Sequence, residues 1–246
     1  MRRIKNSFLL SAIADQGHDG YLMYHAPRYE LLLHLIEQCS INATKILDIG
    51  RSPFSDIAFR ATHISIDTLG FEPDGVTETG FNYQFDLNQT QFVNLWRRDL
   101  PQYQTIIFSE VIEHLYTAPV LVLRFLRSLL TQDGFIIIQT PNAVVLHKRV
   151  QMLLGKNPYN LISEQQNNPT HYREYTYLEL LDFCKSAELN VLSLTYENYF
   201  DYKYTNHLNN QITAHKLYRL INYLYDLLPR SFSPGLCCVA QNSKVF

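Results

Sequence analysis

The segment SEVIEHL, residues 109–115, holds the densest group of side chains that can do chemistry. It directly follows an apolar run. A helical turn there would place Glu110, Glu113 and His114 on one face, because residues three and four apart are neighbours on a helix. Two carboxylates and an imidazole can bind a divalent metal ion, and His114 can instead act as a general base. A structural role is also open, since glutamates favour the positive end of a helix and His114 can cap the loop before Pro119.

Two further acids stand at the ends of apolar runs and suggest a ribose-containing cofactor. Asp67 follows the opening loop LDIGRSPFS by about 20 residues, as in dinucleotide sites, where a carboxylate accepts hydrogen bonds from ribose hydroxyls. Asp86 ends the next apolar run, where it can accept a hydrogen bond from an adenine amino group. Both residues can alternatively be turn or helix-capping residues.

The opening loop itself departs from a glycine-rich turn after Asp48 and Gly50. Ser52 is small enough to let the backbone approach a ligand. Phe54 cannot adopt a glycine-only backbone conformation without strain. We therefore expect Phe54 either to form a wall of the pocket or to mark a site that no longer binds.

Short apolar runs that alternate with amphipathic stretches must position these residues. The runs read as strands buried on both faces, and their alternation with helices predicts an α/β fold. We expect a doubly wound, mostly parallel, Rossmann-like sheet with helices on both faces and ligands beyond the carboxyl ends of the strands. The predicted strands are 44–50, 63–70, 82–88, 103–110, 133–142, 190–200 and 235–241, and the predicted helices are 28–39, a turn after Pro53, 90–98, 119–130, 143–155, 176–189 and 215–228.

The chain is expected to divide at Ala43. Residues 1–42 are predicted to be an N-terminal arm and helix. The apolar run of the arm is too short for a signal peptide, and we expect the arm to be flexible or loosely docked. Residues 43–246 are predicted to be a single domain. Its polar, proline- and asparagine-containing segment, about 143–175, reads as a lid between the fifth and sixth strands.

The overall composition argues against several classes of partner. The formal net charge is -2, with acidic and basic residues interspersed, which argues against general nucleic-acid or acidic-membrane binding. We expect no transmembrane segment, because no apolar run is long enough. The 4 cysteines lack CxxC spacing, which favours a reducing, cytoplasmic compartment. The Leu and Tyr stripe of 215–228 indicates a core or homodimer face rather than a membrane anchor.

The motifs ILDIG, FDLN, SEVIEHL, LLTQDGFIIIQTPN and HYREYTYLELLDFCKSAEL together resemble class I S-adenosylmethionine-dependent methyltransferases, over roughly residues 43–197. The resemblance implies a seven-stranded sheet with a reversed last hairpin, and S-adenosyl-L-methionine as the cofactor. The cofactor-binding residues that it implies are Asp48, Gly50 and Ser52 in the first loop, Asp67 at the ribose, Asp86 and Leu87 at the adenine, and Ser109 and Glu110 near the reactive sulfonium.

A metal site is also implied by resemblance. SEVIEH followed much later by a histidine is similar to ubiquinone-biosynthesis O-methyltransferases and small-RNA terminal 2'-O-methyltransferases, in which a Glu, a Glu-His pair and a distal His hold a divalent ion. The matching ligands are Glu110, Glu113, His114 and His171, although His171 can instead bond the lid or cap the helix after Thr176. We expect His114, His171 and Glu113 to be the catalytic residues that activate a hydroxyl acceptor, as a base or through a metal.

The acceptor is expected to bind at the lid, shaped by Tyr159, His171, Tyr172 and Arg173. GKNP and HYREYT resemble methyltransferases associated with bacterial surface glycans, which favours O-methylation of a small-molecule or sugar hydroxyl. Two other classes stay open. One is a catalytically weak methyltransferase-like binding subunit, which the divergent loop allows. The other is a nicotinamide-dependent oxidoreductase, which would need a GxGxxG loop that GRSPFS lacks.

Overall fold

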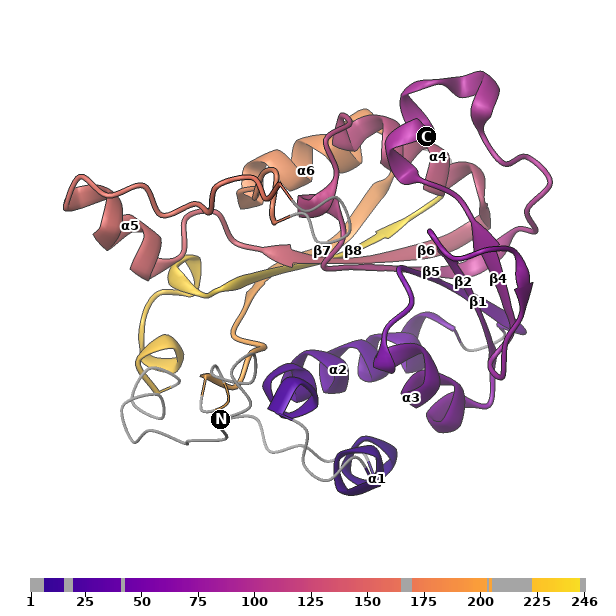
Figure 1. The fold of residues 1–246 in the computed structure, drawn as a ribbon, viewed down its shortest axis with the longest axis horizontal. Coiled ribbons are helices and arrows are strands. Elements are labelled where there is room, and N and C mark those ends of the chain that lie inside the picture. The colour runs from indigo at the N-terminus through magenta and orange to yellow at the C-terminus, as the bar shows by residue number, and fades with distance from the viewer. Residues whose placement is uncertain are drawn as a thin grey trace.

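The computed structural model describes residues 7–15, 20–40, 43–164, 170–202, 204 and 223–243. A central sheet is covered by α4 and α6 on one face and by α1, α2 and α3 on the other (Figure 1), so the predicted α/β class is confirmed. The strands are β1 (Lys45–Ile49), β2 (Ser65–Gly70), β3 (Gly75–Val76), β4 (Phe81–Gln84), β5 (Tyr103–Ser109), β6 (Leu130–Pro141), β7 (Asn190–Glu197) and β8 (Gly235–Gln241). The α-helices are α1 (Ser7–Asp15), α2 (Gly20–Cys39), α3 (Pro53–Thr62), α4 (Pro119–Ser128), α5 (Leu146–Leu153) and α6 (Tyr177–Ser186).

The strand order in the sheet is β3-β4-β2-β1-β5-β6-β8-β7. The five strands from β4 to β6 run parallel, whereas β8 is antiparallel to both β6 and β7. All seven predicted strands are present, and the last two form the expected reversed hairpin. The eighth strand, β3, has two residues and pairs antiparallel with β4 at the edge, too short to show a periodicity in the sequence.

The chain leaves β1 and β5 toward opposite edges of the sheet, because β1 continues to β2 and β5 continues to β6. Their carboxyl ends therefore flank the switch point of the sheet, the place where open α/β sheets bind ligands. Both faces are packed by apolar side chains, one cluster under α4 and α6 and the other under α1, α2 and α3. The ends of β1 and β5 thus project from a rigid core.

The N-terminal arm differs from its prediction. It forms α1, whose Leu9, Ala12 and Ile13 are buried in the cluster shared with α2 and α3. The prediction of a loose arm was wrong because the apolar residues of this short run share one helix face. Helix α2 also begins at Gly20 and runs through Pro27, earlier than predicted.

Residues 90–98 were predicted to be helical but form short 3-10 turns, η1 (Leu87–Gln91) and η2 (Val93–Leu95). Most of the helix predicted at 215–228 lies outside the described residues. Within the segment predicted to be a lid, α5 stands away from the other helices at one end of the molecule (Figure 1). In the described ranges, no helix combines the length and the apolar character needed to cross a membrane.

Candidate functional site

The loop after β1 turns sharply at Gly50, whose φ is +79°. A side chain there would meet Val111 Cγ2 at 3.3 Å from its Cβ, so this turn needs glycine. The chain then enters α3 with Ser52 as the N-cap. Ser52 Oγ accepts a hydrogen bond from the Phe54 N–H at 3.2 Å, and Ser55 completes a capping box. The sequence GRSPFS is therefore the start of a well-capped helix.

Phe54 lies in the first turn of α3 and is not among the described residues with positive φ. The backbone strain that a phenylalanine would suffer in a glycine-only conformation is therefore absent. Its side chain is 2% exposed and packs against Tyr29 of α2, with ring centroids 5.2 Å apart. Phe54 also lines the cavity described next, and so forms part of its wall.

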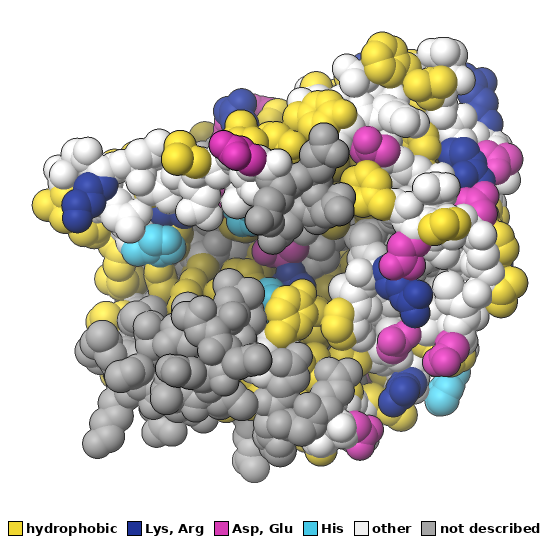
Figure 2. All heavy atoms as spheres, in the orientation of Figure 1, with side chains coloured by type: hydrophobic (Ala, Val, Ile, Leu, Met, Phe, Trp, Pro, Cys, Tyr) yellow, Lys and Arg dark blue, Asp and Glu magenta, His cyan; other side chains and the backbone are white. Residues whose placement is uncertain are grey.

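A central cavity of about 420 Å³ lies between α2 and the carboxyl ends of β1 and β5. Figure 2 shows a hollow in the middle of this face, in which acidic, basic and histidine side chains meet. The predicted residues that line the cavity are Asp48, Gly50, Ser52, Ser109, Glu110, Glu113, His114 and His171, and α2 adds Tyr21, His25, Arg28, Tyr29 and Leu32.

Carboxyl groups dominate the buried part of this cavity. Burial raises the pKa of Asp48 to about 7, although Ser55 Oγ donates a hydrogen bond to its Oδ2 at 2.7 Å. Burial also raises the pKa of Glu110, and burial together with the nearby Glu110 charge raises that of Glu113. A cavity lined by three desolvated carboxyl groups favours a ligand that carries positive charge.

Arg28 is the buried cation of the cavity. Its side chain is 5% exposed, and its Nη1 lies 3.7 Å from Glu110 Oε2. Its Nε has no hydrogen-bond partner among the described residues. The other cation, Arg51, is half-exposed, and its Nη1 lies 3.7 Å from Glu72 Oε2. A buried guanidinium with an unused donor can bind an anionic group of a ligand, so the cavity offers sites for both signs of charge.

A side cavity of about 300 Å³ adjoins the central one and shares Gly50, Arg51 and Val111 with it. It runs along the carboxyl ends of β2 and β4. Its apolar lining includes the predicted Leu87, together with Phe85 and Leu115. Asp86 does not line it: its Oδ1 accepts hydrogen bonds from the backbone N–H and the side-chain amide of Asn88, at 2.9 and 3.0 Å. Asp86 is thus the turn-capping residue that its alternative interpretation described.

Asp67 does not reach either cavity. It lies in the middle of β2, is 0% exposed, and accepts hydrogen bonds from the Phe81 N–H at 2.8 Å and the Tyr103 hydroxyl at 3.0 Å. Lys45 Nζ lies 3.3 Å from Asp67 Oδ2. The structure therefore does not place Asp67 where a ribose could bond it. The acid that lines the side cavity beyond the end of β2 is Glu72, which the sequence analysis missed.

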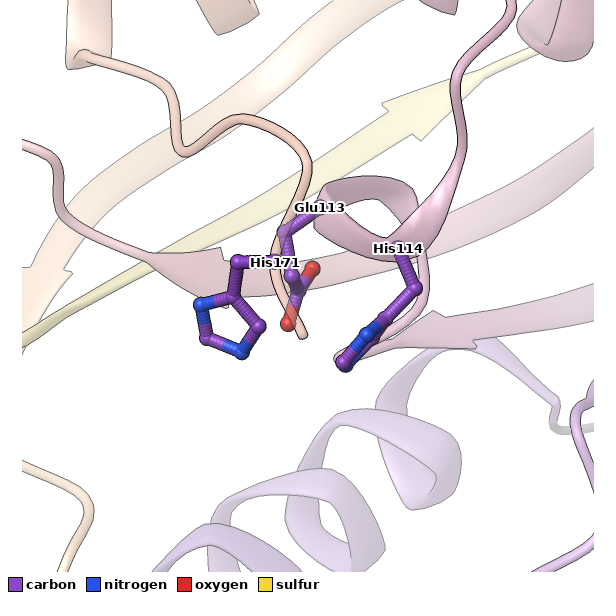
Figure 3. A group of neighbouring side chains, drawn as sticks. All are labelled: Glu113, His114 and His171. Atoms are coloured by element: carbon purple, nitrogen blue, oxygen red, sulfur yellow. The ribbon is translucent and has the colours of Figure 1, made fainter. Parts of the chain in front are cut away.

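Three of the four predicted metal ligands meet. Glu113 and His114 come from η3 (Ile112–His114), and His171 comes from the segment before α6 (Figure 3). Their ligand atoms lie within 4.8 Å of one another, and the two imidazole rings meet edge to face. The Tyr172 N–H donates to the Glu113 carbonyl at 2.8 Å, which holds His171 beside η3. We call Glu113, His114 and His171 the Glu-His-His cluster.

Glu110 lies outside this cluster. Its φ is +56°, and the Tyr199 hydroxyl donates to its Oε1 at 2.9 Å. Within the cluster, Thr140 Oγ1 donates to Glu113 Oε2 at 3.0 Å, whereas Glu113 Oε1 has no hydrogen-bond partner among the described residues. A proton or a cation would satisfy that buried oxygen.

Glu174, which the sequence analysis also missed, fixes the orientation of His171. His171 Nδ1 lies 2.9 Å from Glu174 Oε1, and Lys148 Nζ bonds Glu174 Oε2. Burial alone would raise the pKa of Glu174, but the hydrogen bonds from His171 and Lys148 outweigh it and lower the pKa. The other ring nitrogen, His171 Nε2, is on the side of Glu113 and His114 (Figure 3). A carboxylate that fixes one nitrogen of an imidazole leaves the other available as a base or a ligand.

Solved structures with the same fold support the topology. A SAM-dependent methyltransferase from Archaeoglobus fulgidus is 15% identical, with 87% of this chain and 94% of that chain covered and a TM-score of 0.51. A putative sarcosine dimethylglycine methyltransferase from Galdieria sulphuraria is 9% identical, with 88% and 85% covered and a TM-score of 0.54.

A third such structure is the 1,6-didemethyltoxoflavin-N1-methyltransferase from Burkholderia thailandensis, with bound 1,6-didemethyltoxoflavin and S-adenosylhomocysteine. It is 13% identical, with 97% and 87% covered and a TM-score of 0.52. No curated protein sequence matches the chain. The family model for a methyltransferase domain matches residues 24–194, which is well over half of the chain, and the protein therefore belongs to the methyltransferase domain family.

Proposed function

We propose that this protein is an S-adenosylmethionine-dependent methyltransferase that methylates a hydroxyl oxygen. The observation that carries the choice of oxygen is the Glu-His-His cluster at the wall of the central cavity. A hydroxyl needs a base or a metal ion to become a good nucleophile, and the cluster supplies groups for either. The charges of the cavity support this cofactor. So does the Burkholderia thailandensis structure, which has the same fold and contains bound S-adenosylhomocysteine.

The lining residues fit this cofactor part by part. Glu72 would accept hydrogen bonds from the ribose, while Phe85, Leu87 and Leu115 would pack on the adenine in the side cavity. In the central cavity, Arg28 would bind the carboxylate of the methionine part and Asp48 its ammonium group. Ser109 and Glu110 would border the positive sulfonium. An apolar pocket with a few placed charges is the usual form of such a site.

When bound, the cofactor supplies a methyl group: the acceptor oxygen bonds the methyl carbon as the carbon–sulfur bond breaks and its electron pair stays on sulfur. His171 takes the proton of the acceptor hydroxyl at Nε2. Glu174 accepts the Nδ1–H bond and stabilises the imidazolium that forms. Glu113 and His114 line the same wall and hold the acceptor oxygen against His171.

The cluster would also hold a divalent cation, since one carboxylate and two imidazoles are a common ligand set for such ions. The unpaired Glu113 Oε1 supports this fit. The ion would lower the pKa of a bound hydroxyl and so replace the base. Glu110, predicted as a fourth ligand, is engaged with Tyr199 and is left out of this proposal.

Calorimetry with S-adenosylhomocysteine tests the cofactor, with and without Mg²⁺, Mn²⁺ or Zn²⁺. We expect binding, and its absence under all of these conditions would refute the proposed function. For the metal, His114→Ala should abolish the ion bound by the protein after dialysis, whereas His34→Ala, on the exposed face of α2, should leave it unchanged. Equal metal content in both variants would refute the metal site.

The two alternative classes have distinct outcomes. A catalytically weak binding subunit would bind S-adenosylhomocysteine but transfer no methyl group to any hydroxyl acceptor. A nicotinamide-dependent oxidoreductase would bind NAD instead, and it is not favoured, because GRSPFS forms a capped helix start and the family is that of methyltransferases. Competition between NAD and S-adenosylhomocysteine in the same calorimeter separates these outcomes.

A further inference from the structure

Tyr199 connects the reversed hairpin of the sheet to the wall of the central cavity. It follows the end of β7, and its side chain is buried, with 1% exposed. Its hydroxyl lies 2.9 Å from Glu110 Oε1, 3.1 Å from the Thr140 carbonyl and 3.4 Å from the Leu236 carbonyl. A hydroxyl has a single proton to donate, and Glu110 is the nearest of these acceptors and the one that can carry a charge. We therefore assign the Tyr199 proton to Glu110.

Gly235, the first residue of β8, makes room for the ring of Tyr199. A Cβ atom at this position would lie 2.2 Å from Tyr199 Cζ and 2.5 Å from the hydroxyl oxygen, well inside van der Waals contact. A side chain at Gly235 would thus push the Tyr199 ring away, and with it the hydroxyl that bonds Glu110. The close approach of the hairpin strand to this ring sets the position of the hydroxyl.

Glu110 is held at both carboxylate oxygens before any ligand binds. Tyr199 bonds Oε1, and Arg28 Nη1 lies 3.7 Å from Oε2. Burial raises the pKa of Glu110, whereas the charge of Arg28 and the hydrogen bond from Tyr199 oppose this rise and so favour the ionised form. Glu110 lines the central cavity. A carboxylate fixed in advance in a water-poor cavity attracts a cation without first having to reorganise.

The charge of Glu110 becomes available to the sulfur when the cofactor binds. Arg28 Nε has no hydrogen-bond partner among the described residues and would bind the carboxylate of the methionine part, which offsets the charge of Arg28. The negative charge of Glu110 is then free to attract the positive sulfonium. Methyl transfer turns that sulfonium into a neutral thioether and so removes the attraction.

We propose that Tyr199 is a positioning residue that lets the central cavity distinguish the charged sulfonium of S-adenosylmethionine from the neutral sulfur of S-adenosylhomocysteine, by holding the Glu110 carboxylate beside the sulfur. Tyr199 is not among the residues that line the cavity, so it acts through Glu110. This inference rests on the proposed function and adds a residue that determines which charge state of the cofactor is preferred. Because the attraction ends with methyl transfer, the product leaves the site more readily than the cofactor does.

Calorimetry on the full-length protein at pH 8, without a methyl acceptor, tests this inference. S-adenosylmethionine carries a positive sulfonium, sinefungin carries an ammonium group at the same place, and S-adenosylhomocysteine has a neutral sulfur there. We expect the wild type to bind each charged ligand about tenfold more tightly than S-adenosylhomocysteine. Tyr199→Phe removes the hydroxyl alone and should reduce both affinity ratios by about threefold or more, while the affinity for S-adenosylhomocysteine stays within about twofold of wild type.

Tyr103→Phe is the matched control. It removes another buried tyrosine hydroxyl that donates to a carboxylate, that of Asp67, and neither residue lines the central or the side cavity. It should lower the melting temperature but leave both affinity ratios unchanged. Gly235→Ala is a second variant should Tyr199→Phe fail to fold, and it should reduce the same ratios because its methyl group displaces the Tyr199 ring.

Three results would overturn the inference: equal affinity of the wild type for the charged and neutral ligands, unchanged ratios in Tyr199→Phe and Gly235→Ala, or an equal fall of the ratios in Tyr103→Phe. Any of them, with S-adenosylhomocysteine still bound by the wild type, leaves the proposed function standing. If the wild type binds none of these ligands, the proposed function itself is refuted.

Discussion

Replacing Asp48 by asparagine should stabilise the unliganded protein at alkaline pH. Asp48 is buried, and its pKa in the folded protein is about 7, against 3.8 for an ordinary aspartate. Between these two values the folded state holds a proton that the unfolded state has released. The stability contributed by this group is therefore present at low pH and is lost as the pH rises through 7.

The gain in the free energy of unfolding follows from the difference between the two pKa values, about three units. At about 1.4 kcal/mol for each pKa unit, the upper bound is about 4 kcal/mol. The asparagine side chain would keep an oxygen that accepts the Ser55 hydroxyl but would carry no charge at any pH. The advantage of Asp48→Asn over wild type should thus be small at pH 4 and approach about 4 kcal/mol above pH 8.

Urea unfolding at pH 5 and pH 8 measures this change. Asp56→Asn is the matched control, because it removes an acid from the first turn of the same helix without touching the cavity. It should change the free energy of unfolding by less than about 1 kcal/mol at either pH. If wild type and Asp48→Asn lose the same stability between pH 5 and pH 8, Asp48 is not a desolvated carboxyl and the charge argument for the central cavity fails.

Three further predictions concern the cofactor and the base. Arg28→Met should weaken the binding of S-adenosylhomocysteine at least tenfold in calorimetry. It should leave the binding of 5'-methylthioadenosine unchanged, because that molecule lacks the amino-acid part, and an equal loss of affinity for both ligands would contradict the role of Arg28. Glu72→Ala should weaken the binding of S-adenosylhomocysteine about tenfold and leave the melting temperature unchanged. Asp67→Ala should lower the melting temperature, because it leaves buried hydrogen-bond donors unpaired. The reverse pattern would indicate that Asp67 is the acid that binds the ribose. His171→Ala should slow methyl transfer by a factor of about 100 or more while S-adenosylhomocysteine still binds; an unchanged rate would exclude His171 as the base.

The fold could be predicted because its strands are nearly continuous apolar runs separated by helical patterns. Runs such as YQTIIFS and the segment around FIIIQ have no other simple interpretation in a chain of this length. The reversed hairpin and the cluster of Glu113, His114 and His171 came from resemblance to a family. Residue spacing alone gave no reason to bring His171, far along the chain, to the turn after β5.

Asp67 shows where one-dimensional reasoning failed. The strand predicted at 63–70 already extended past Asp67. What the sequence HISIDTLG does not reveal is that Tyr103 and Phe81 supply the hydrogen bonds of Asp67 from other strands. Arg28 was missed for a related reason, because an arginine on a helix is usually solvated. Its burial depends on how α2 crosses the ends of β1 and β5, which no pattern within α2 specifies.

The left-handed backbone at Glu110 has a consequence for directed evolution of this protein. A non-glycine residue with φ of +56° is disfavoured by about 1–2 kcal/mol relative to glycine. Glu110→Gly would relieve that strain but would leave the buried Arg28 guanidinium and the Tyr199 hydroxyl without their acidic partner, which costs more, so a screen that rewards heat resistance alone should not enrich it. The glycine variant should also lose methyl transfer, because the wall of the central cavity beside the proposed sulfonium position loses a carboxyl group. A screen for heat resistance and a screen for turnover should therefore both retain the glutamate, despite its strained backbone.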